Sequence, residues 1–424
     1  MFNLFKPHIL KLPHLKKTAN LQTVAFRHEK QVKLALIQAR QTPAVKKGDT
    51  VCVGQVVGTP LDATAVYVHA SVSGTVVAVS ESDILIQSDG LFTPLEALAT
   101  PVIGNFDDFI QAVRLSGLVG LGGAGFPAHI KWQAASKNTI DTLLINAAEC
   151  EPYITSDVRE IIENMQDIKD GIDILAKQLG VKKTIIGIES HNKTAIDLLK
   201  QTFKGASVEI KVLPTDYPQG AEKILIKSCT GKILPVGKLP FELGIIVSNV
   251  STVGELGRYM NTGMPLVSRR VTVDGGSVKT AQNVSVPIGT TVADVIDFCG
   301  GYGLPVGKLL LGGPMMGVTV NEEDVISNKT NGLIVMSTVE SIEKEELNCI
   351  RCARCIDNCP VDLLPVSIDQ AVRVNDLATL KTLDLDVCLG CGMCSFVCPS
   401  NRTLVHHIGI GKELLKAEEK GGQK

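Results

Sequence analysis

The sequence has almost no excess of charge of either sign and no long apolar run. Its 42 basic and 44 acidic residues leave a formal net charge of −2, which gives no electrostatic footprint for nucleic acid or for a strongly acidic partner. No stretch reaches the roughly 18 consecutive apolar residues that a membrane-spanning helix needs. The most apolar pieces, residues 241–250 and 309–320, are short and contain Gly, Pro or Asn. A spanning segment is therefore not expected.

The start of the chain also lacks a secretory leader, because Lys6, Pro7, Lys11 and Pro13 interrupt it. Hydrophobic residues make up 45% of the chain and charged residues 20%, so a packed protein is expected and disorder is not. We therefore expect a soluble cytoplasmic protein, and 424 residues should form about three domains. Residues 6–17 are locally basic and form either a solvated arm or a docking surface for a partner or a membrane.

Twelve cysteines are present, and their distribution argues against a disulfide framework. Eight lie between Cys349 and Cys398, in two runs of Cys-x2-Cys-x2-Cys-x3-Cys-Pro. A disulfide framework would spread its cysteines over a small secreted domain, so the two runs indicate metal ligands. The other four are isolated and are expected to be buried apolar residues: Cys52, Cys150, Cys229 and Cys299.

Two [4Fe–4S] clusters are the expected occupants of these runs. Thiolates at every third position can face one side of a cube, and in two-cluster ferredoxins the last cysteine of each run ligates the other cluster. The alternative is zinc, which commonly takes two separated Cys-x2-Cys pairs and does not need this repeat. We assign to cluster 1 Cys349, Cys352, Cys355 and Cys398, and to cluster 2 Cys388, Cys391, Cys394 and Cys359.

Three kinds of segment precede the cysteine runs. Residues 45–87 alternate short Val-rich bursts with Gly, Asp, Pro and Ser, as small antiparallel β structures do, and resemble the barrel of biotinyl and lipoyl carrier domains. The turn at residues 59–62 has no modifiable lysine, so a structural role is expected.

Residues 106–250 alternate short apolar strands with amphipathic helices, such as 158–179, which indicates a parallel sheet covered by helices. Residues 269–301 suit a small β-grasp module of two strands and a helix.

A glycine-rich segment, GLVGLGGAGFPAHIKW at residues 117–132, lies in the α/β region. Clustered glycines before a helix let backbone N–H groups approach a phosphate or a flat ring closely. The segment matches neither the Walker pattern nor a Rossmann fingerprint cleanly. NAAECEPYITSD follows the next strand and places Asn146, Glu149 and Glu151 within six residues. Either segment alone suits a structural turn, but together, in a chain that carries clusters, they indicate a nucleotide site.

These motifs resemble the flavin- and NADH-binding subunit of respiratory complex I, through GLxGxGGAGFPxxxKW followed by NAxExEP. The order of barrel, flavin-type fold, β-grasp module and two-cluster region resembles more closely the C subunit of the Rnf ion-translocating electron transport complex, the RnfC family. Further matches extend the resemblance over residues 33–405. They are YPQGAEK at 217–223, VSNVSTV at 247–253 and GGPMMG at 312–317.

The resemblance implies an FMN held non-covalently in the glycine-rich domain, with NAD(H) stacked over it. By motif, the FMN cradle would comprise Gly122, Gly123, Gly125, Lys131, Asn146, Asn249 and Thr252, with Tyr217 and Gly220 near the flavin. On the nicotinamide nucleotide side would lie Phe126, Glu151 and Glu222, and Glu149 completes the cofactor-binding set. No catalytic residue is expected, because hydride transfer itself needs no acid or base.

The expected fold is multidomain α/β. Its parts are an N-terminal arm (1–40), a biotinyl-like β barrel (41–100), a Rossmann-like parallel α/β domain for FMN and NAD(H) (101–260), a β-grasp module of the SLBB type (261–335), an α-helical two-cluster ferredoxin-like domain (336–411) and a flexible tail (412–424).

The expected function is that of a ferredoxin:NAD+ oxidoreductase component that passes electrons between clusters, FMN and NAD(H). Its partners would be Rnf-type membrane subunits or ferredoxin, with the chain in the cytoplasm or peripheral on the cytoplasmic face of the cell membrane. One alternative is an electron-transfer protein that feeds a soluble reductase of the proline-reductase type. It is motivated by residues 6–19, KPHILKLPHLKKTA, where the Rnf family usually has Gly-Gly-(Ile/Val)-His-Pro-Pro and Lys. A second alternative is a relay without nucleotide binding, against which Glu151 and Glu222 argue.

Overall fold

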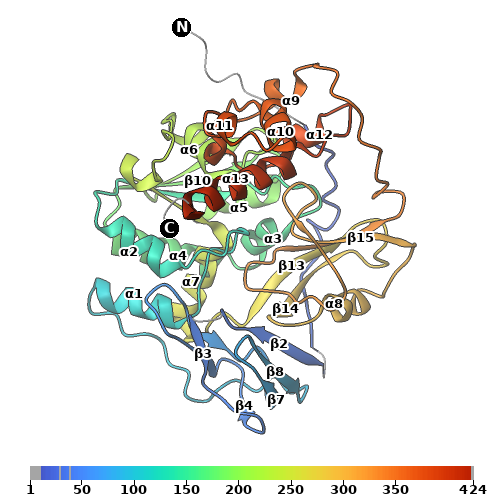
Figure 1. The fold of residues 1–424 in the computed structure, drawn as a ribbon. Coiled ribbons are helices and arrows are strands. Elements are labelled where there is room, and N and C mark those ends of the chain that lie inside the picture. Colours follow the sequence, from blue (N-terminus) through green and yellow to red (C-terminus); the bar gives the residue numbers. More distant parts are fainter. Residues whose placement is uncertain (1–10, 28–29, 38–39, 422–424) are drawn as a thin grey trace.

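The computed structural model describes residues 11–27, 30–37 and 40–421 of the chain. Figure 1 shows the barrel at the bottom in blue, the parallel sheet and its helices at the centre and left, and a six-stranded sheet at the right. The cysteine-bearing helices lie at the top, in orange and red. The multidomain α/β architecture expected from the sequence is confirmed.

Two small antiparallel sheets, with strand orders β2-β8-β7-β4 and β3-β5-β6, form the N-terminal barrel. Alternate residues of β2 and β8 point inward, so Val32, Leu34, Ile84 and Ile86 are buried in its core. Strand β2 lies ahead of residue 41, where the sequence predicted the barrel to begin. The strands are β2 (Gln31–Ala35), β3 (Gln41–Pro43), β4 (Thr50–Val51), β5 (Val56–Pro60), β6 (Val68–His69), β7 (Gly74–Val79) and β8 (Asp83–Ser88).

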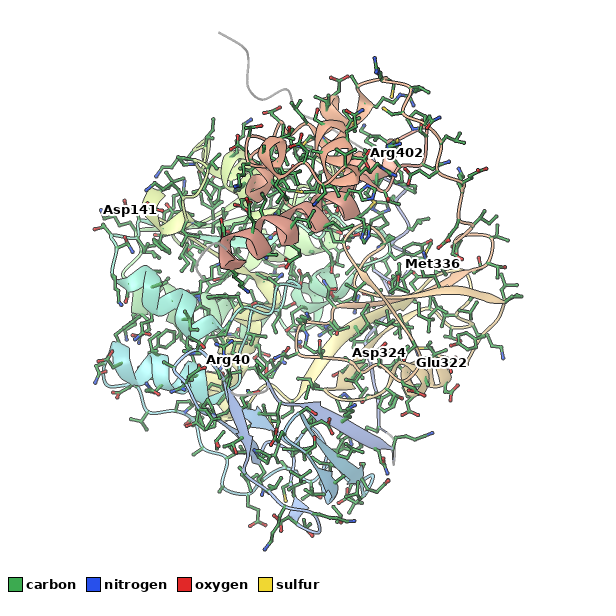
Figure 2. The ribbon with its side chains drawn as sticks, viewed as in Figure 1. Arg40, Asp141, Glu322, Asp324, Met336 and Arg402 are labelled. Atoms are coloured by element: carbon green, nitrogen blue, oxygen red, sulfur yellow. The ribbon has the colours of Figure 1, made fainter. Side chains whose placement is uncertain are left out.

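The turn at residues 59–62 packs against the helical domain. Arg114 in α1 (Phe106–Leu115) donates hydrogen bonds to the backbone carbonyls of Asp62 and Ala65. Arg40, labelled in Figure 2, forms an ion pair with Asp62 at 3.1 Å. A turn held in this way suits the structural role that the absence of a lysine indicated.

All four strands of the central sheet are parallel, in the order β11-β10-β9-β12. β9 has β10 on one side and β12 on the other, so the strand order reverses there. One face is covered by α2, α4, α5 and α7, and the other by α6. The elements are α2 (Ala128–Ser136), β9 (Thr142–Ala147), α3 (Ser156–Glu163), α4 (Met165–Leu179), β10 (Lys183–Glu189), α5 (Lys193–Thr202), β11 (Val208–Leu213), α6 (Glu222–Thr230), η1 (Pro240–Leu243), β12 (Ile245–Asn249) and α7 (Val250–Thr262).

The single helix predicted over residues 158–179 is two helices, α3 and α4. Asn164 lies between them with φ −127° and ψ 37°, outside the helical region. Its side-chain amide donates to Glu160 Oε1 at 3.0 Å, the kind of local side-chain bond through which Asn competes with helix continuation. Gly180 ends α4 in the left-handed conformation.

A six-stranded mixed sheet, in the order β1-β14-β13-β17-β15-β16, contains the two strands predicted within residues 269–301. The helix predicted after them is capped by Thr291, whose hydroxyl accepts the Asp294 N–H at 3.1 Å. β1 pairs in parallel with β14, a contribution from the N-terminus that no local pattern indicated. The elements are β1 (Val24–Ala25), β13 (Ser268–Asp274), β14 (Gln282–Pro287), α8 (Val292–Phe298), β15 (Val306–Leu311), β16 (Val318–Val320) and β17 (Gly332–Ser337).

The helices around the eight cysteines form the last domain. Buried Asp369 at its centre pairs with Arg402 and His407, and with Arg373 at 3.0 Å (Figure 2 labels Arg402). Across the described ranges, none of the helices combines the length and apolar character that crossing a bilayer takes. The elements are α9 (Arg354–Asp357), α10 (Pro365–Arg373), α11 (Leu377–Leu380), η2 (Leu385–Val387), α12 (Met393–Phe396) and α13 (Leu404–Gly421).

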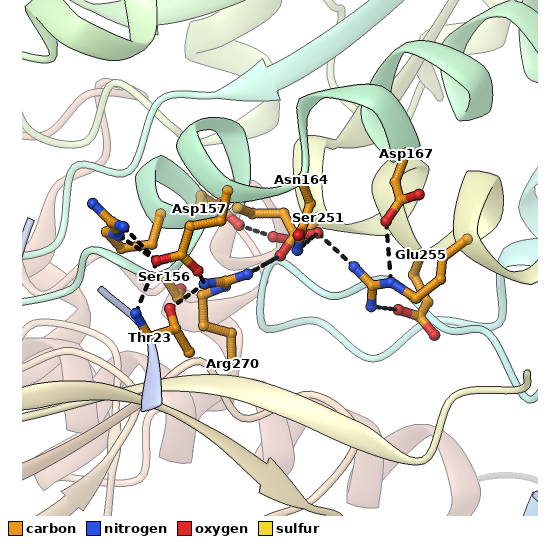
Figure 3. A network of polar contacts seen from close by, with 12 residues as sticks. Thr23, Ser156, Asp157, Asn164, Asp167, Ser251, Glu255 and Arg270 are labelled. Carbon is orange, nitrogen blue, oxygen red and sulfur yellow. Dashed lines mark hydrogen bonds and ion pairs between the residues drawn. The ribbon is translucent and has the colours of Figure 1, made fainter. Parts of the chain in front are cut away.

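A buried ion-pair network joins the parallel-sheet domain to the six-stranded sheet (Figure 3). Arg270 in β13 pairs with Glu160 at 2.9 Å and with Glu163, both in α3, and it also contacts the Thr23 hydroxyl. Burial alone would raise the pKa of Glu163, but hydrogen bonds from Arg159, Thr23 and Arg270 outweigh it and hold the pKa at about 2. The network therefore fixes how the two sheets sit against each other.

Residues 16–19 of the N-terminal arm contact the α/β domain. Lys16 Nζ donates to the backbone carbonyls of Glu149 at 2.5 Å and Ile154 at 2.6 Å. Residues 1–10, which include the first part of the predicted basic stretch, lie outside the described residues. Lys16 therefore anchors the backbone of the loop that carries Glu149 and Glu151, which belong to the predicted nucleotide site.

Candidate functional site

The carboxyl ends of β9 and β12 meet at the edge where the predicted nucleotide residues lie. The two strands are parallel, and Asn146 lies beside Asn249 in register. Because the strand order reverses at β9, this edge is the topological switch point, where open α/β sheets bind ligands. The Asn146 side-chain amide donates to the Gly220 carbonyl at 2.8 Å, and its oxygen accepts the Ala148 N–H at 3.1 Å. Asn146 therefore ties two loops together at this edge.

The glycine-rich loop lies directly against Asn249. A Cβ at Gly122 would lie 3.2 Å from the Asn249 side-chain nitrogen, so a larger residue would push the loop away. Gly123 has a φ of 108°, which side chains rarely adopt. The Leu121 N–H donates to Thr252 Oγ1 at 2.9 Å and anchors the loop to α7. Backbone groups of the loop are thereby held at the switch point.

These elements enclose a pocket of about 290 Å³, which we name the nucleotide pocket. Among the predicted cofactor-binding residues, its lining includes Gly122, Asn146, Glu149, Glu151, Gly220, Glu222 and Asn249. Cys150, expected to be a buried apolar residue, also lines it. Met316 and Asn331 reach it from the six-stranded module. Met316 belongs to the GGPMMG match at 312–317 but was not assigned to the site, and no motif indicated Asn331.

The remaining predicted residues lie around this pocket. Gly125 and Phe126 line a separate cavity of about 450 Å³ between the loop and the barrel, and Phe126 is half exposed. Lys131 forms an ion pair with Glu222 at 3.0 Å, with both side chains partly exposed. Thr252 supports the glycine-rich loop from α7. The structure therefore brings part of the predicted set into one pocket but places Gly125 and Phe126 in a separate cavity.

Glu149 shapes the wall of the pocket by capping α3. Its buried carboxylate accepts hydrogen bonds from the Ser156 hydroxyl and the Asp157 N–H, both at 2.9 Å. Asp157 is buried as well and accepts from the side chains of Asn249 and Ser251, both at 2.6 Å. Burial, and then the neighbouring Glu149, raise the pKa of Asp157.

Glu151 is held at the opposite wall. Its Oε2 accepts the Met315 N–H at 3.0 Å, while Oε1 has no hydrogen-bond partner within the described part of the chain. Burial raises the pKa of Glu151 to about 7. A Cβ at Gly313 would lie 2.3 Å from Glu151 Oε2, so the loop at residues 312–317 reaches Glu151 only with glycine there.

Tyr217 connects the nucleotide pocket to the cysteine domain. Its side chain is only 2% exposed, and its hydroxyl donates to the backbone carbonyl of Cys391 at 2.8 Å. Leu389 and Cys391 themselves line the nucleotide pocket. Met315 packs against the same group of side chains. One of the two cysteine sets therefore lies at the pocket wall.

The cysteines assigned to cluster 1 surround a cavity of about 280 Å³, lined by Cys349, Cys352, Cys355 and Cys398. The last cysteine of the second run thus lies with the first three of the first run, as the predicted crossed pairing requires. Four thiols around a space suit a cube ligated at its corners, whereas a zinc ion draws its sulfur ligands to about 2.3 Å. Among the described residues, no three His, Cys, Asp or Glu side chains are placed to hold a single metal ion.

Cys359 lies with the cysteines of the second run. Burial raises the pKa of Cys391 to about 11 and that of Cys394 to about 12, and Cys359 and Cys388 add to both shifts as neighbours. The Leu363 N–H donates to Cys359 Sγ at 3.3 Å. Amide hydrogen bonds of this kind stabilise the charge on cluster sulfurs and tune the potential. This set fits the four ligands predicted for cluster 2.

Four family models match the chain in the order expected from the sequence. They are the RnfC barrel sandwich hybrid domain over residues 8–93, the Nuo51 FMN-binding domain over 113–258, the SLBB domain over 270–319 and the 4Fe-4S dicluster domain over 348–402. The match to an FMN-binding domain covers the glycine-rich loop and both asparagines of the switch point.

Curated relatives extend this similarity to nearly the whole chain. The C subunit of the Na(+)-translocating ferredoxin:NAD(+) oxidoreductase complex of Acetobacterium woodii is 38% identical over 91% of this chain and 90% of its own length. The chain belongs to the RnfC family. The corresponding protein of the proton-translocating complex of Clostridium ljungdahlii is 37% identical over 78% of this chain and 75% of its own. The RnfC-family protein of Rhodobacter capsulatus is 36% identical over 80% of this chain and 69% of its own.

Solved structures share the fold at greater distance. An NAD+-reducing [NiFe]-hydrogenase in the H2-reduced state matches with a TM-score of 0.51 and 19% identity, over 74% of this chain and 61% of that chain. That likeness concerns the fold alone. The recognition of an RnfC-family chain from its sequence is confirmed, as are the FMN and [4Fe–4S] cofactors expected for it.

Proposed function

We propose that this chain passes electrons between NAD(H), FMN and two [4Fe–4S] clusters, as the C subunit of an ion-translocating ferredoxin:NAD+ oxidoreductase complex. The observation that supports the proposal is that the cysteine domain and the α/β domain both line the nucleotide pocket. Leu389 and Cys391 of the cysteine domain line the same pocket as Asn146 and Asn249 of the α/β switch point. A nucleotide in this pocket would lie against a cluster ligand, so electrons would have only a short distance to cross.

FMN bound in the nucleotide pocket would supply the exchange between a two-electron hydride and single electrons. Gly122 leaves room for it beside Asn249, and Asn146 holds the Gly220 loop at its edge. The Lys131–Glu222 pair lies at the exposed rim, where an ammonium group suits a phosphate. NAD(H) would lie on the side of Phe126, Glu151 and Glu222. The wider FMN set comprises Gly123, Gly125, Tyr217 and Thr252.

For the clusters we retain the crossed assignment, with Cys398 joining the first run and Cys359 joining the second. Cluster 2 would be the nearer to FMN, because its ligand Cys391 lines the nucleotide pocket. Cluster 1 would exchange electrons with the partner, because its ligand Cys352 is exposed. The partners would be other Rnf-type subunits or ferredoxin, with the chain peripheral on the cytoplasmic face of the membrane.

The proposal is tested on the purified chain under anaerobic conditions. We expect about eight irons, two clusters' worth of sulfide and about one FMN per chain, with both chromophores bleached by NADH. Asn146→Leu should lose FMN and NADH bleaching but keep its iron. Asn138→Leu, at an exposed asparagine on the same domain, is the matched control and should behave like the parent. Full clusters without flavin, and no bleaching in the parent, would contradict the proposal.

A further inference from the structure

A second, smaller cavity lies behind the nucleotide pocket. It has a volume of about 20 Å³, and its lining includes His14, Lys16, Cys150, Glu189 and His191. Cys150 also lines the nucleotide pocket, so the two spaces share this residue in their walls. A cavity of this size holds about one water molecule when polar groups surround it.

Buried polar atoms without hydrogen-bond partners belong to residues that line the two spaces. Glu151 lines the nucleotide pocket, and Glu189 and His191 line the smaller cavity. Glu151 Oε1, Glu189 Oε2 and His191 Nε2 are all buried and have no hydrogen-bond partner within the described residues. A buried polar atom left unpaired destabilises the fold, so three in the walls of two cavities that share Cys150 call for a functional reason.

Glu189 ends β10 and is only 1% exposed. Burial raises its pKa to about 7; Lys16 opposes this shift, while Glu149 and Asp216 add to it. For Glu151, burial is again the main cause of a pKa of about 7, and Lys16 is the charged neighbour that opposes it. Both carboxyl groups therefore exchange protons near neutral pH. Burial also raises the pKa of the intervening Cys150 thiol to about 12, so it keeps its proton.

His191 connects the smaller cavity to the protein surface at His14. His191 Nδ1 lies 3.0 Å from Thr215 Oγ1, and the His191 ring meets the exposed His14 edge to face, with ring centroids 4.4 Å apart. Burial, then Lys16 and His14, lower the pKa of His191 to about 4. A neutral imidazole with one nitrogen unpartnered can accept a proton on one side and release one on the other.

The proposed reaction requires a proton to cross this region. Oxidation of NADH yields NAD+, one proton and two electrons, and the reverse reaction consumes the same set. The electrons pass to clusters ligated by thiolates alone, which carry no proton with them. One proton per dinucleotide must therefore travel between the nucleotide pocket and water by a separate route.

We propose that Glu151, the Cys150 thiol, Glu189 and His191 form a proton path from the nucleotide pocket to the surface at His14. The inference rests on the proposed function. In the NADH-oxidising direction a proton passes from the pocket to Glu151. The Cys150 thiol accepts a proton from Glu151 as it releases its own to Glu189, and His191 then takes a proton from Glu189 and releases one to solvent. No bonds other than those to protons change. Lys16 positions the path, because it anchors the acidic loop carbonyls and faces Glu189.

The test compares Glu189→Gln with Glu209→Gln in the holoprotein. Glu209 lies on the adjacent strand β11, is partly exposed and pairs with Lys183 at 2.6 Å, so it is the matched control. Stopped-flow absorbance with NADH and a one-electron acceptor is recorded in H2O and D2O. Glu189→Gln should leave the first flavin bleaching unchanged but slow sustained electron delivery about tenfold or more. The parent and Glu209→Gln should show a solvent isotope effect on that delivery.

A second readout does not depend on turnover. The infrared difference spectrum between oxidised and reduced protein should contain a carboxyl C=O band in the parent and in Glu209→Gln that Glu189→Gln lacks. Equal rates and equal bands in the two variants overturn the proton path. A slower rate with an unchanged band also overturns it, because Glu189 would then be merely structural. If Glu189→Gln fails to incorporate iron and FMN, His191→Gln provides the same test at the next step.

The two proposals fail in different ways. If NADH does not bleach the parent protein, the proposed function is wrong and the proton path falls with it. If NADH bleaches the parent and Glu189→Gln turns over like Glu209→Gln, the proposed function stands and only the proton path is wrong.

Discussion

The Tyr217 hydroxyl donates a hydrogen bond to the backbone carbonyl of Cys391 at 2.8 Å, across the boundary between the α/β domain and the cysteine domain. Tyr217 follows strand β11, and Cys391 lies in the second cysteine run. The bond is buried, and Leu389 next to it lines the nucleotide pocket. The distance between FMN and cluster 2 would therefore depend on this contact.

Tyr217→Phe tests that dependence. Removing the hydroxyl leaves the buried Cys391 carbonyl without its donor, at a cost of about 1–3 kcal/mol. Phe keeps the ring near the flavin and removes only the hydroxyl bonded to Cys391. We therefore expect normal iron and FMN content and normal flavin bleaching by NADH, but cluster bleaching slower by several-fold. Stopped-flow spectra separate the two phases. The control is Tyr302→Phe, where the hydroxyl contacts Glu322 at 2.5 Å in a different domain (Figure 2 labels Glu322). Equal slowing in both variants would speak against a role for the Cys391 contact.

Gly313→Ala should damage the nucleotide pocket selectively. The new methyl group would lie 2.3 Å from Glu151 Oε2 and would displace either the carboxylate or the loop at residues 312–317. We expect weaker NADH binding, measured as a higher NADH concentration for half-maximal flavin bleaching, with full iron content. Gly409→Ala is the control, because a Cβ there meets no atom within 4 Å. The explanation fails if Gly313→Ala titrates with NADH like the control.

The cluster ligands were predicted from the local spacing of the cysteines, and Asn146 and Asn249 from the resemblance to the RnfC family; their roles in binding cofactors stay predictions. Cysteines three residues apart can reach one cube, and Asn146 and Asn249 lie at the carboxyl ends of two apolar strands. The proton path could not be predicted in this way. Lys16, Glu189 and His191 belong to no motif, and Lys16 comes from an arm far from the others in sequence.

The boundaries of helices and strands were also predicted poorly from the sequence. The pattern over residues 158–179 is amphipathic throughout, so it does not show the break at Asn164, where a local side-chain bond to Glu160 separates α3 from α4. Likewise, β1 has two residues and becomes a strand only by pairing with β14. Short strands stabilised by partners distant in sequence leave little periodicity to read.

The crossed cysteine pairing predicts a pattern among single variants. Cys398→Ser should give the same electron paramagnetic resonance spectrum of the remaining cluster as Cys352→Ser, because both remove a ligand of cluster 1. Cys359→Ser should match Cys394→Ser instead. Each variant should retain about four of eight irons. Cys229→Ser, at a buried isolated cysteine, should keep all of them. Uncrossed ligation would make Cys398→Ser resemble Cys394→Ser.

Glu189→Gln also has a predicted effect on stability. The folded-state pKa of about 7 lies above the ordinary value of 4.5, so the folded protein binds this proton more tightly than the unfolded chain. Ionisation then destabilises the fold progressively as pH rises from about 4.5 to about 7. The variant removes this penalty and should gain up to about 3 kcal/mol over the parent at pH 8, since one pKa unit corresponds to about 1.4 kcal/mol. Thermal denaturation should show a gap that widens with pH; a constant gap would argue against a buried titrating Glu189.

Arg270→Met should destabilise the junction between the two sheets. It removes one of two arginine partners from both glutamates, since Glu160 keeps Arg258 and Glu163 keeps Arg159. Leaving a buried charge wholly unpaired costs about 3–5 kcal/mol, so a loss of about 3 kcal/mol is expected here. The control is Lys169→Met, which breaks an exposed pair with Asp173 and should cost about 0.5 kcal/mol or less. Urea denaturation followed by circular dichroism measures both. Similar losses in the two variants would show that the network in Figure 3 contributes little.

The most direct test of electron transfer across the shared pocket wall is the order of bleaching after anaerobic mixing with NADH. The account predicts that flavin absorbance falls first and cluster absorbance follows. In Cys391→Ser, which removes a cluster 2 ligand at the pocket wall, the flavin phase should remain and the cluster phase should be lost. Cluster bleaching that precedes flavin bleaching, or that persists at the parent rate in Cys391→Ser, would contradict it.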